Sequence, residues 1–255
     1  MADSIVQKIN ANFKGKQGTL LYTLIACFVA NAIATFADFG VVFDVLSPVV
    51  EFVAVLLLVS ELSDAKEHWM SGFYVLFGIF FWIISDVLLV VYTYFMSGNL
   101  YLVAISDTLY LAPNYVFGIA LSVYTLEEID RSKWYSFALP MIVGLLISFV
   151  IIYHVTGWGS GMIQYTNEYG VSDIAYFGGV ALNLVALCTN LILRKFRQRP
   201  HSFFVFLAGL FIYNLFEFRY GYCIMTGENP EVPAIDLIYI FAIVLLVLSY
   251  RNNRK

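Results

Sequence analysis

Long apolar stretches separated by short polar segments run along almost the whole chain. Each stretch is about 20 residues long or slightly more, which is the length that an α-helix needs to cross the hydrocarbon layer of a bilayer. Helices are expected because lipid offers no hydrogen-bond partner to an unpaired backbone group. The pattern predicts an all-α bundle of about eight transmembrane helices, at roughly 19–37, 41–60, 71–96, 101–125, 134–155, 172–193, 202–224 and 233–250.

The basic residues predict on which side of the membrane each loop lies. Cytoplasmic loops carry an excess of Lys and Arg. If the N-terminus is cytoplasmic, the inside segments hold 13 of the 14 Lys and Arg residues, and the outside loops hold none. The remaining basic residue, Arg219, falls inside the seventh stretch. We therefore expect an even number of spans with both termini in the cytoplasm.

The composition agrees with a single membrane domain over residues 1–255. Hydrophobic residues make up 61% of the chain and charged residues only 13%, whereas soluble domains are about a quarter charged. The net charge is −4, and the sequence has no long basic run and no nucleic-acid motif, so nucleic acid is not an expected partner. The three cysteines are scattered through apolar stretches and form no disulfide framework.

Two similar halves follow one another along the chain. The segment GIFFWIISD at 78–86 matches GLFIYNLFE at 209–217. Four helices in each half give both halves the same orientation, so the sequence predicts a parallel repeat with a pseudo-two-fold axis along the membrane normal. The repeats are expected at 19–125 and 134–250. The matching pairs are Asp86 with Glu217 at an offset of 131, and Asp107 with Asp236, Tyr110 with Tyr239 and Asp44 with Asp173 at 129.

Acidic residues occur within these predicted spans, where a charge is costly and usually faces a cavity or a partner. By the predicted topology six of them fall toward the outer leaflet, namely Asp44, Asp86, Asp107, Asp173, Glu217 and Asp236. Glu51 follows Asp44 by one heptad, so the two side chains share one helix face. The sequence therefore predicts an acidic cavity that opens outward and binds a ligand. The candidate ligand-binding residues are Asp44, Glu51, Asp107, Tyr110, Asn114, Asp173, Arg219, Asp236 and Tyr239, beside the carboxyl groups of Asp86 and Glu217.

A structural role is the alternative for these carboxylates. In the first turn of a helix, a carboxylate caps free N–H groups and complements the helix dipole. A deeper carboxylate is stabilised by an ion pair with Arg219 or by a hydrogen bond from a tyrosine. The first interpretation applies to Asp44, Asp107, Asp173 and Asp236, and the second applies to Glu51, Asp86 and Glu217.

Several other chemistries are not expected. The histidines at 68, 154 and 201 are not spaced as a metal or haem pair on one helix, so no metal or other cofactor is predicted. The last span has no lysine that would form a retinal Schiff base. Neither a GxSxG elbow nor a phosphate loop occurs. Any catalysis would therefore be carboxylate chemistry.

One family resemblance rests on FWIISDVLLVVYTYF at 81–95, followed by ISDTLYLAPNY at 105–115 and repeated as AIDLIYIF at 234–241. An Asp in an aromatic third span and an Asp-x-x-Tyr-Leu start to the fourth resemble the multi-span membrane domains of bacterial and archaeal signalling proteins. Those domains precede cyclic-di-GMP or histidine-kinase modules. The resemblance implies a sensor-like module in a prokaryotic inner membrane. It would bind a small molecule or a membrane lipid and would signal through a partner protein.

A more distant resemblance is to the lysoplasmalogenase (YhhN-type) membrane proteins, which also have eight spans. Asp86 fits their third-span acid, Tyr110 fits their fourth-span tyrosine, and Glu217 stands at their second acid. This resemblance implies a hydrolase of ether lysolipids in which Asp86 and Glu217 are the acid–base pair. The parallel repeat and the acidic lining leave a third hypothesis, a carrier of a small solute or cation.

Overall fold

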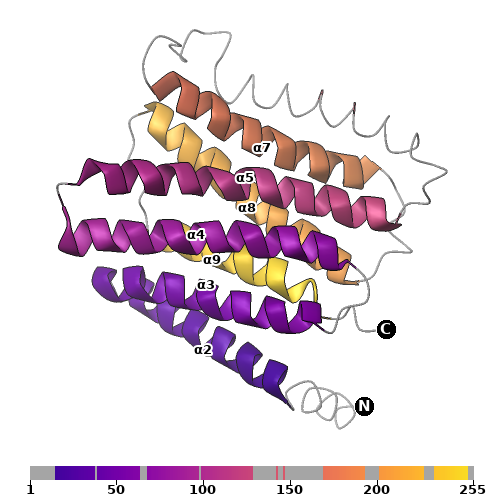
Figure 1. Cartoon of the computed structure of the whole chain (residues 1–255), viewed down its shortest axis with the longest axis horizontal. Helices are drawn as coiled ribbons and strands as arrows, with labels where there is room; N and C mark the ends of the chain where they lie inside the picture. The colour runs from indigo at the N-terminus through magenta and orange to yellow at the C-terminus, as the bar shows by residue number, and fades with distance from the viewer. Residues whose placement is uncertain are drawn as a thin grey trace.

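The structure is a computed structural model that describes residues 15–37, 39–63, 68–97, 99–128, 142, 146, 169–192, 201–226 and 233–251. All regular secondary structure in these residues is helical (Figure 1). The helices are α2 (Lys16–Phe36), α3 (Gly40–Ser63), α4 (Trp69–Phe95), α5 (Leu100–Glu128), α7 (Tyr169–Ile192), α8 (His201–Thr226) and α9 (Pro233–Leu248).

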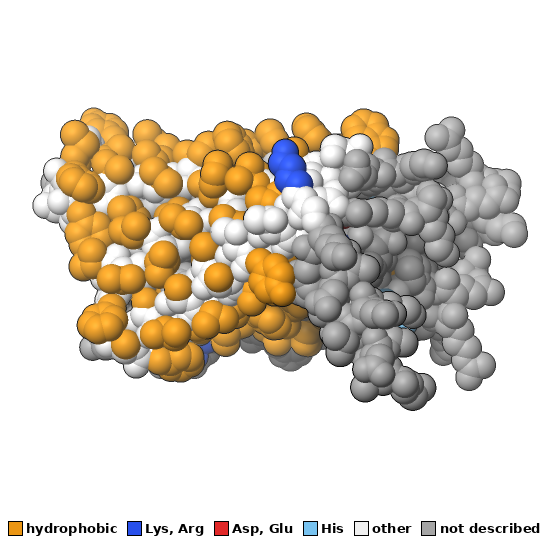
Figure 2. All heavy atoms as spheres, turned by 90° about the horizontal axis from the view of Figure 1, so that it is seen from below, with side chains coloured by type: hydrophobic (Ala, Val, Ile, Leu, Met, Phe, Trp, Pro, Cys, Tyr) orange, Lys and Arg blue, Asp and Glu red, His pale blue; other side chains and the backbone are white. Residues whose placement is uncertain are grey.

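Five of these helices are long and apolar enough to cross a membrane. They are α2, α3, α4, most of α5 and the first 20 residues of α8. The outward faces of these helices carry large apolar side chains, such as Phe73, Phe77 and Phe80 on α4. Figure 2 shows hydrophobic side chains over most of the described part of one face. A soluble protein would expose few such patches. The chain is therefore an integral membrane protein built as a helical bundle.

The predicted helices agree with the structure wherever the structure describes the chain. Seven of the eight predicted spans correspond to α2, α3, α4, α5, α7, α8 and α9. The predicted span at 134–155 lies outside the described residues, apart from 142 and 146. The count of eight spans, the repeat and the cytoplasmic position of both termini stay predictions.

The helices pack in a pattern that repeats within the bundle. α3 packs against α4 and α9, and α7 packs against α8 and α5 (Figure 1). α4 pairs with α5, and α8 pairs with α9. Smaller contacts join α4 to α9 and α5 to α8. Exchanging α3, α4 and α5 for α7, α8 and α9 maps each of these contacts onto another contact in the set. The exchange leaves out α2, which packs against α3 and α9.

Two glycines let the paired helices approach closely. A Cβ at Gly78 on α4 would lie 2.5 Å from the ring of Phe117 on α5. A Cβ at Gly209 on α8 would lie 3.1 Å from the backbone of α9 at Ala242 and Leu246. Small residues at such crossings are typical of membrane helices, whose association depends on close van der Waals packing. Both crossings hold α5 and α9 in place beside the acidic residues of α4 and α8.

Candidate functional site

A group of three carboxylates lies between α3 and α4. Asp44 and Glu51 are on α3, and Asp86 is on α4. Glu51 is fully buried, whereas Asp44 and Asp86 are partly exposed. The carboxyl group of Glu51 faces that of Asp86 closely enough for the two to interact, and the charge of Asp44 also acts on Asp86. The three side chains thus lead from a partly exposed position into the interior of the bundle.

Tyrosines donate hydrogen bonds to two of these carboxylates. The Tyr110 hydroxyl on α5 donates to Oδ1 of Asp86. The Tyr94 hydroxyl near the end of α4 donates to Oδ2 of Asp44 at 2.6 Å. Within the described residues, neither oxygen of Glu51 has an N–H or hydroxyl partner. Glu51 is therefore a buried carboxyl group that interacts with another carboxyl group, that of Asp86.

The backbone of α3 has an interruption at the same place. Pro48 lies inside α3, between Asp44 and Glu51. Proline has no N–H, so it cannot complete the helical hydrogen bond to the carbonyl of Asp44, four residues earlier. The backbone oxygen of Asp44 is thus left without its usual helical partner. In membrane helices such interruptions are tolerated where other groups satisfy the freed oxygen.

A further buried carboxylate, Glu217 on α8, has hydrogen-bond donors on both of its oxygens. Asn114 Nδ2 on α5 donates to Oε2 at 3.1 Å, and the Tyr239 hydroxyl on α9 donates to Oε1 at 3.0 Å. The Tyr213 hydroxyl on α8 donates in turn to Oδ1 of Asn114 at 2.6 Å. Glu217 is almost fully buried, and this network gives it the partners that a buried carboxylate needs.

Trp82 on α4 lies between the two carboxylate groups. Its ring packs edge-to-face on Tyr110, Tyr213 and Tyr239, with ring centroids 5.6, 5.5 and 5.1 Å apart. Such arrangements place the positive edge of one ring on the negative face of another. Carboxylates, tyrosines and Trp82 thus form one central polar cluster inside the apolar bundle. Its members are Glu51, Trp82, Asp86, Tyr110, Asn114, Tyr213, Glu217 and Tyr239.

Three of the candidate ligand-binding residues lie outside this cluster or beyond description. Asp107 is exposed on α5, and no hydrogen bond or ion pair joins it to a described residue of the cluster. Arg219 is exposed on α8, and no ion pair joins it to Glu51, Asp86 or Glu217 in the described structure. The side chain of Asp173 on α7 lies outside the described residues.

The remaining candidate residues lie in or next to the cluster. Asp236 is partly exposed at the start of α9, and its charge acts on Tyr110. Asp44 lies beside Asp86 at the partly exposed side. The structure therefore brings most of the candidate residues together. The members that the sequence analysis missed are Trp82 and Tyr213, which occupy matching positions at the repeat offset of 131.

The capping interpretation is wrong for three of the four residues to which it applied. α3, α5 and α7 begin at Gly40, Leu100 and Tyr169, earlier than predicted, and none of them has an acidic residue in its first turn. The aspartates on these helices lie at least one turn further in. Only Asp236 lies in a first turn, that of α9. The ion-pair alternative finds no support in the described residues, but the tyrosine hydrogen bonds to Asp86 and Glu217 are present.

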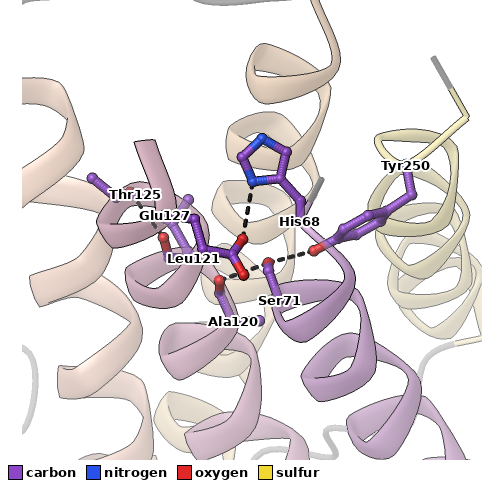
Figure 3. A network of polar contacts seen from close by, with 7 residues as sticks. All are labelled: His68, Ser71, Ala120, Leu121, Thr125, Glu127 and Tyr250. Atoms are coloured by element: carbon purple, nitrogen blue, oxygen red, sulfur yellow. Dashed lines mark hydrogen bonds and ion pairs between the residues drawn. The ribbon is translucent and has the colours of Figure 1, made fainter. Parts of the chain in front are cut away.

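Another polar group lies at the opposite end of α4 and α5 (Figure 3). Nδ1 of His68 lies 3.0 Å from Oε2 of Glu127, and the His68 ring stacks on Tyr124 with centroids 3.8 Å apart. The Ser71 hydroxyl donates to the carbonyl of Ala120 at 2.8 Å and lies 2.6 Å from the Tyr250 hydroxyl. This group is about 25 Å from Tyr110 along α5, by the rise of an α-helix.

The hydrogen bonds of this end group have a defined direction. Ser71 has one hydroxyl proton, which it gives to Ala120, so Tyr250 must be the donor to Ser71. The bonds tie the start of α4 and the end of α5 to the residues that follow α9. We interpret this group as structural, because it holds these helix ends together.

Comparison with known proteins does not identify a family for this chain, so its function has to be inferred from the geometry of the polar cluster. No protein-family model, no curated protein and no solved structure matches the chain. In the part of the chain that the structure describes, no group of three or more His, Cys, Asp or Glu side chains is placed to hold a metal ion. The resemblances to sensor domains and to lysoplasmalogenases stay expectations.

Proposed function

We propose that the protein is a membrane ligand-binding module, similar to a sensor domain, whose acidic site opens to the outer side. The observation that carries the proposal is the burial of Glu51 against Asp86, without a hydrogen-bond donor or a basic residue among the described neighbours. Charged groups in a membrane interior are expensive and usually mark a functional site. An apolar pair would pack there at lower cost. A ligand that interacts with both carboxyl groups gives their position a reason.

Access from one side supports the same proposal. Asp44 and Asp86 are partly exposed, and Glu51 lies one heptad further along α3. A ligand that enters beside Asp44 would therefore meet Asp86 and then Glu51. The ligand is a small molecule or a membrane lipid. We further propose that binding is passed to a signalling partner protein in the inner membrane of a prokaryote, as the resemblance to sensor domains implies.

The proposed topology has eight spans, a parallel repeat and both termini in the cytoplasm. The distribution of Lys and Arg supports the orientation. The matched helix contacts of α3–α5 and α7–α9 support the repeat. Further support comes from equivalent hydrogen bonds, because Tyr110 donates to Asp86 and Tyr239 donates to Glu217. Both pairs are at matching positions of the two halves.

Side-specific thiol labelling tests the outward opening. Cys27, Cys188 and Cys223 are first replaced by alanine, and Asp44→Cys is then introduced. We expect a membrane-impermeant thiol reagent to modify this variant in intact cells. Ser63→Cys, at the exposed far end of the same helix, is the matched control and should react only in inside-out vesicles. Failure of Asp44→Cys to react from outside, in folded protein, would contradict the proposal.

An intramembrane lysolipid hydrolase is the second candidate. One observation favours it. Asp86 and Glu217 belong to the same polar cluster, because Trp82 packs against both Tyr110 and Tyr239, the tyrosines that donate to these two carboxyl groups. An acid–base pair must reach one substrate from two sides. The purified protein would be incubated with a lysoplasmalogen, and the release of aldehyde would be followed. Release that Asp86→Asn abolishes supports this candidate, and no release from folded protein rejects it for that substrate.

A further inference from the structure

The two halves of the bundle differ at one acidic position. At the offset of 129 that relates Asp44 to Asp173, Glu51 on α3 corresponds to Val180 on α7, which is also fully buried. Glu217, the counterpart of Asp86, therefore has no second carboxyl group at the position that matches Glu51. It instead receives hydrogen bonds from Asn114 and Tyr239. Among the described residues, two carboxyl groups lie face to face in the first half alone.

The surroundings of the Glu51–Asp86 pair are negative. Asp44 acts on Asp86, and Asp236 acts on Tyr110, which is the hydrogen-bond donor to Asp86. No described Lys, Arg or His side chain forms an ion pair with Glu51, Asp86 or Asp44. Two ionised carboxylates side by side in a low-dielectric interior repel each other strongly. The pair therefore needs either a shared proton or a bound positive charge, and no described basic side chain supplies that charge.

The titratable groups around the pair come from several helices. α2 also packs against α3, but its only lysine, Lys16, is at the far end. The neighbouring Gln17 bonds there to the carbonyl of Ser60, nine residues beyond Glu51. The titratable groups that face the pair or its partners are Asp44 on α3, Tyr94 on α4, Tyr110 on α5, Glu217 on α8, and Asp236 and Tyr239 on α9.

We infer that Glu51 and Asp86 bind one small monovalent cation between their carboxyl groups, in exchange for a proton. The inference rests on the ligand-binding function proposed above and names the class of its ligand. One proton leaves the pair for each cation that binds, so the total charge of the site is unchanged. A divalent ion is less suitable, because the described residues offer no group of three acidic or histidine ligands. The Tyr110 hydroxyl, which donates to Asp86, is a further oxygen atom next to the pair.

Cation-dependent thermal stability tests the inference. The purified full-length protein is kept in detergent with N-methylglucamine chloride at constant ionic strength. This salt is replaced stepwise by sodium, potassium or methylammonium chloride at pH 6 and pH 8.5. A cation that binds only the folded protein raises Tm, and above its dissociation constant the rise grows with the logarithm of the cation concentration. We expect at least one of the three to do so at pH 8.5. Where protons compete, the cation concentration that gives a fixed rise in Tm should increase about tenfold for each unit by which pH falls.

Variants locate the effect in the pair. Glu51→Gln and Asp86→Asn should each lose the cation-dependent rise in Tm. Glu51→Gln is expected to fold, because its amide is uncharged and can donate a hydrogen bond to Asp86. Glu61→Gln is the matched control, since Glu61 is another buried carboxyl group on α3, ten residues further along. It should keep the full response to the cation.

Two results would overturn the inference. One is a wild-type Tm that responds to none of the three cations at pH 8.5. The other is a cation response that survives in Glu51→Gln. Both are separable from failure of the proposed function. Outside labelling of Asp44→Cys without any cation response rejects the cation and keeps the outward site. A cation response without outside labelling rejects the outward opening and keeps the cation site.

Discussion

At the residue scale, Glu51 and Glu217 are buried carboxyl groups with different surroundings. Glu217 accepts hydrogen bonds from Asn114 and Tyr239, so its charge is compensated by dipoles that the chain itself supplies. Glu51 has only the carboxyl group of Asp86 in front of it. A buried acceptor without a partner has a free-energy cost of about 1–3 kcal/mol, and more when it is charged. We therefore interpret Glu217 as structural and the Glu51–Asp86 pair as the binding site.

The hydrogen bond from Tyr239 to Glu217 gives a prediction at this scale. Tyr239→Phe keeps the ring against Trp82 but removes the donor to a buried carboxylate. We expect the free energy of unfolding to fall by about 1–3 kcal/mol, measured as a lower Tm in detergent. Tyr101→Phe is the control, because Tyr101 is 82% exposed, and it should leave Tm unchanged. An unchanged Tm in Tyr239→Phe would mean that Glu217 does not depend on this donor.

At the scale of the helices, hydropathy predicted the elements well but placed some of their ends wrongly. The apolar stretch marks the part of a helix inside the hydrocarbon, whereas α3 and α5 continue past it at both ends. α5 was expected at 101–125 and runs from Leu100 to Glu128. Asp44 consequently leaves the first turn, where capping was expected, whereas Asp107 lies beyond the first turn whether α5 begins at 100 or at 101. Boundary shifts of this size decide the role of a polar residue, although they hardly change the fold.

The two glycine crossings give a prediction for the packing of helix pairs. Gly78→Ala would place a Cβ against the buried ring of Phe117, and Gly209→Ala would place one against the backbone of α9. Overpacking of this kind typically destabilises by about 1–3 kcal/mol. We expect a lower Tm in both variants. Gly40→Ala is the matched control, because nothing lies within 4 Å of a Cβ there. If all three variants behave alike, close packing at these crossings is not what holds the pairs together.

At the scale of the whole molecule, the proposed internal repeat predicted which helices would carry equivalent residues. The sequence matched Asp86 with Glu217 and Tyr110 with Tyr239, and the structure has a tyrosine–carboxylate hydrogen bond in each pair. The cluster around them was only partly predictable. Trp82 and Tyr213 match at the same offset, but a membrane helix carries aromatic residues on every face. Periodicity alone cannot separate those that face lipid from those that face the interior.

The whole account depends on the claim that Glu51 is kept for binding and not for stability. Sites of this kind typically cost stability, so removing the charge is expected to help the fold. The most direct measurement is the Tm of Glu51→Gln and Glu217→Gln in N-methylglucamine buffer at pH 8.5, without added ligand. The account predicts that Glu51→Gln is at least as stable as the wild type, because the substitution removes an uncompensated buried carboxylate. It predicts that Glu217→Gln is less stable, because the amide oxygen can accept from only one of the two donors, Asn114 and Tyr239, and the NH2 group faces the other. A clearly lower Tm for Glu51→Gln would contradict the central claim and would make Glu51 a structural residue of the bundle.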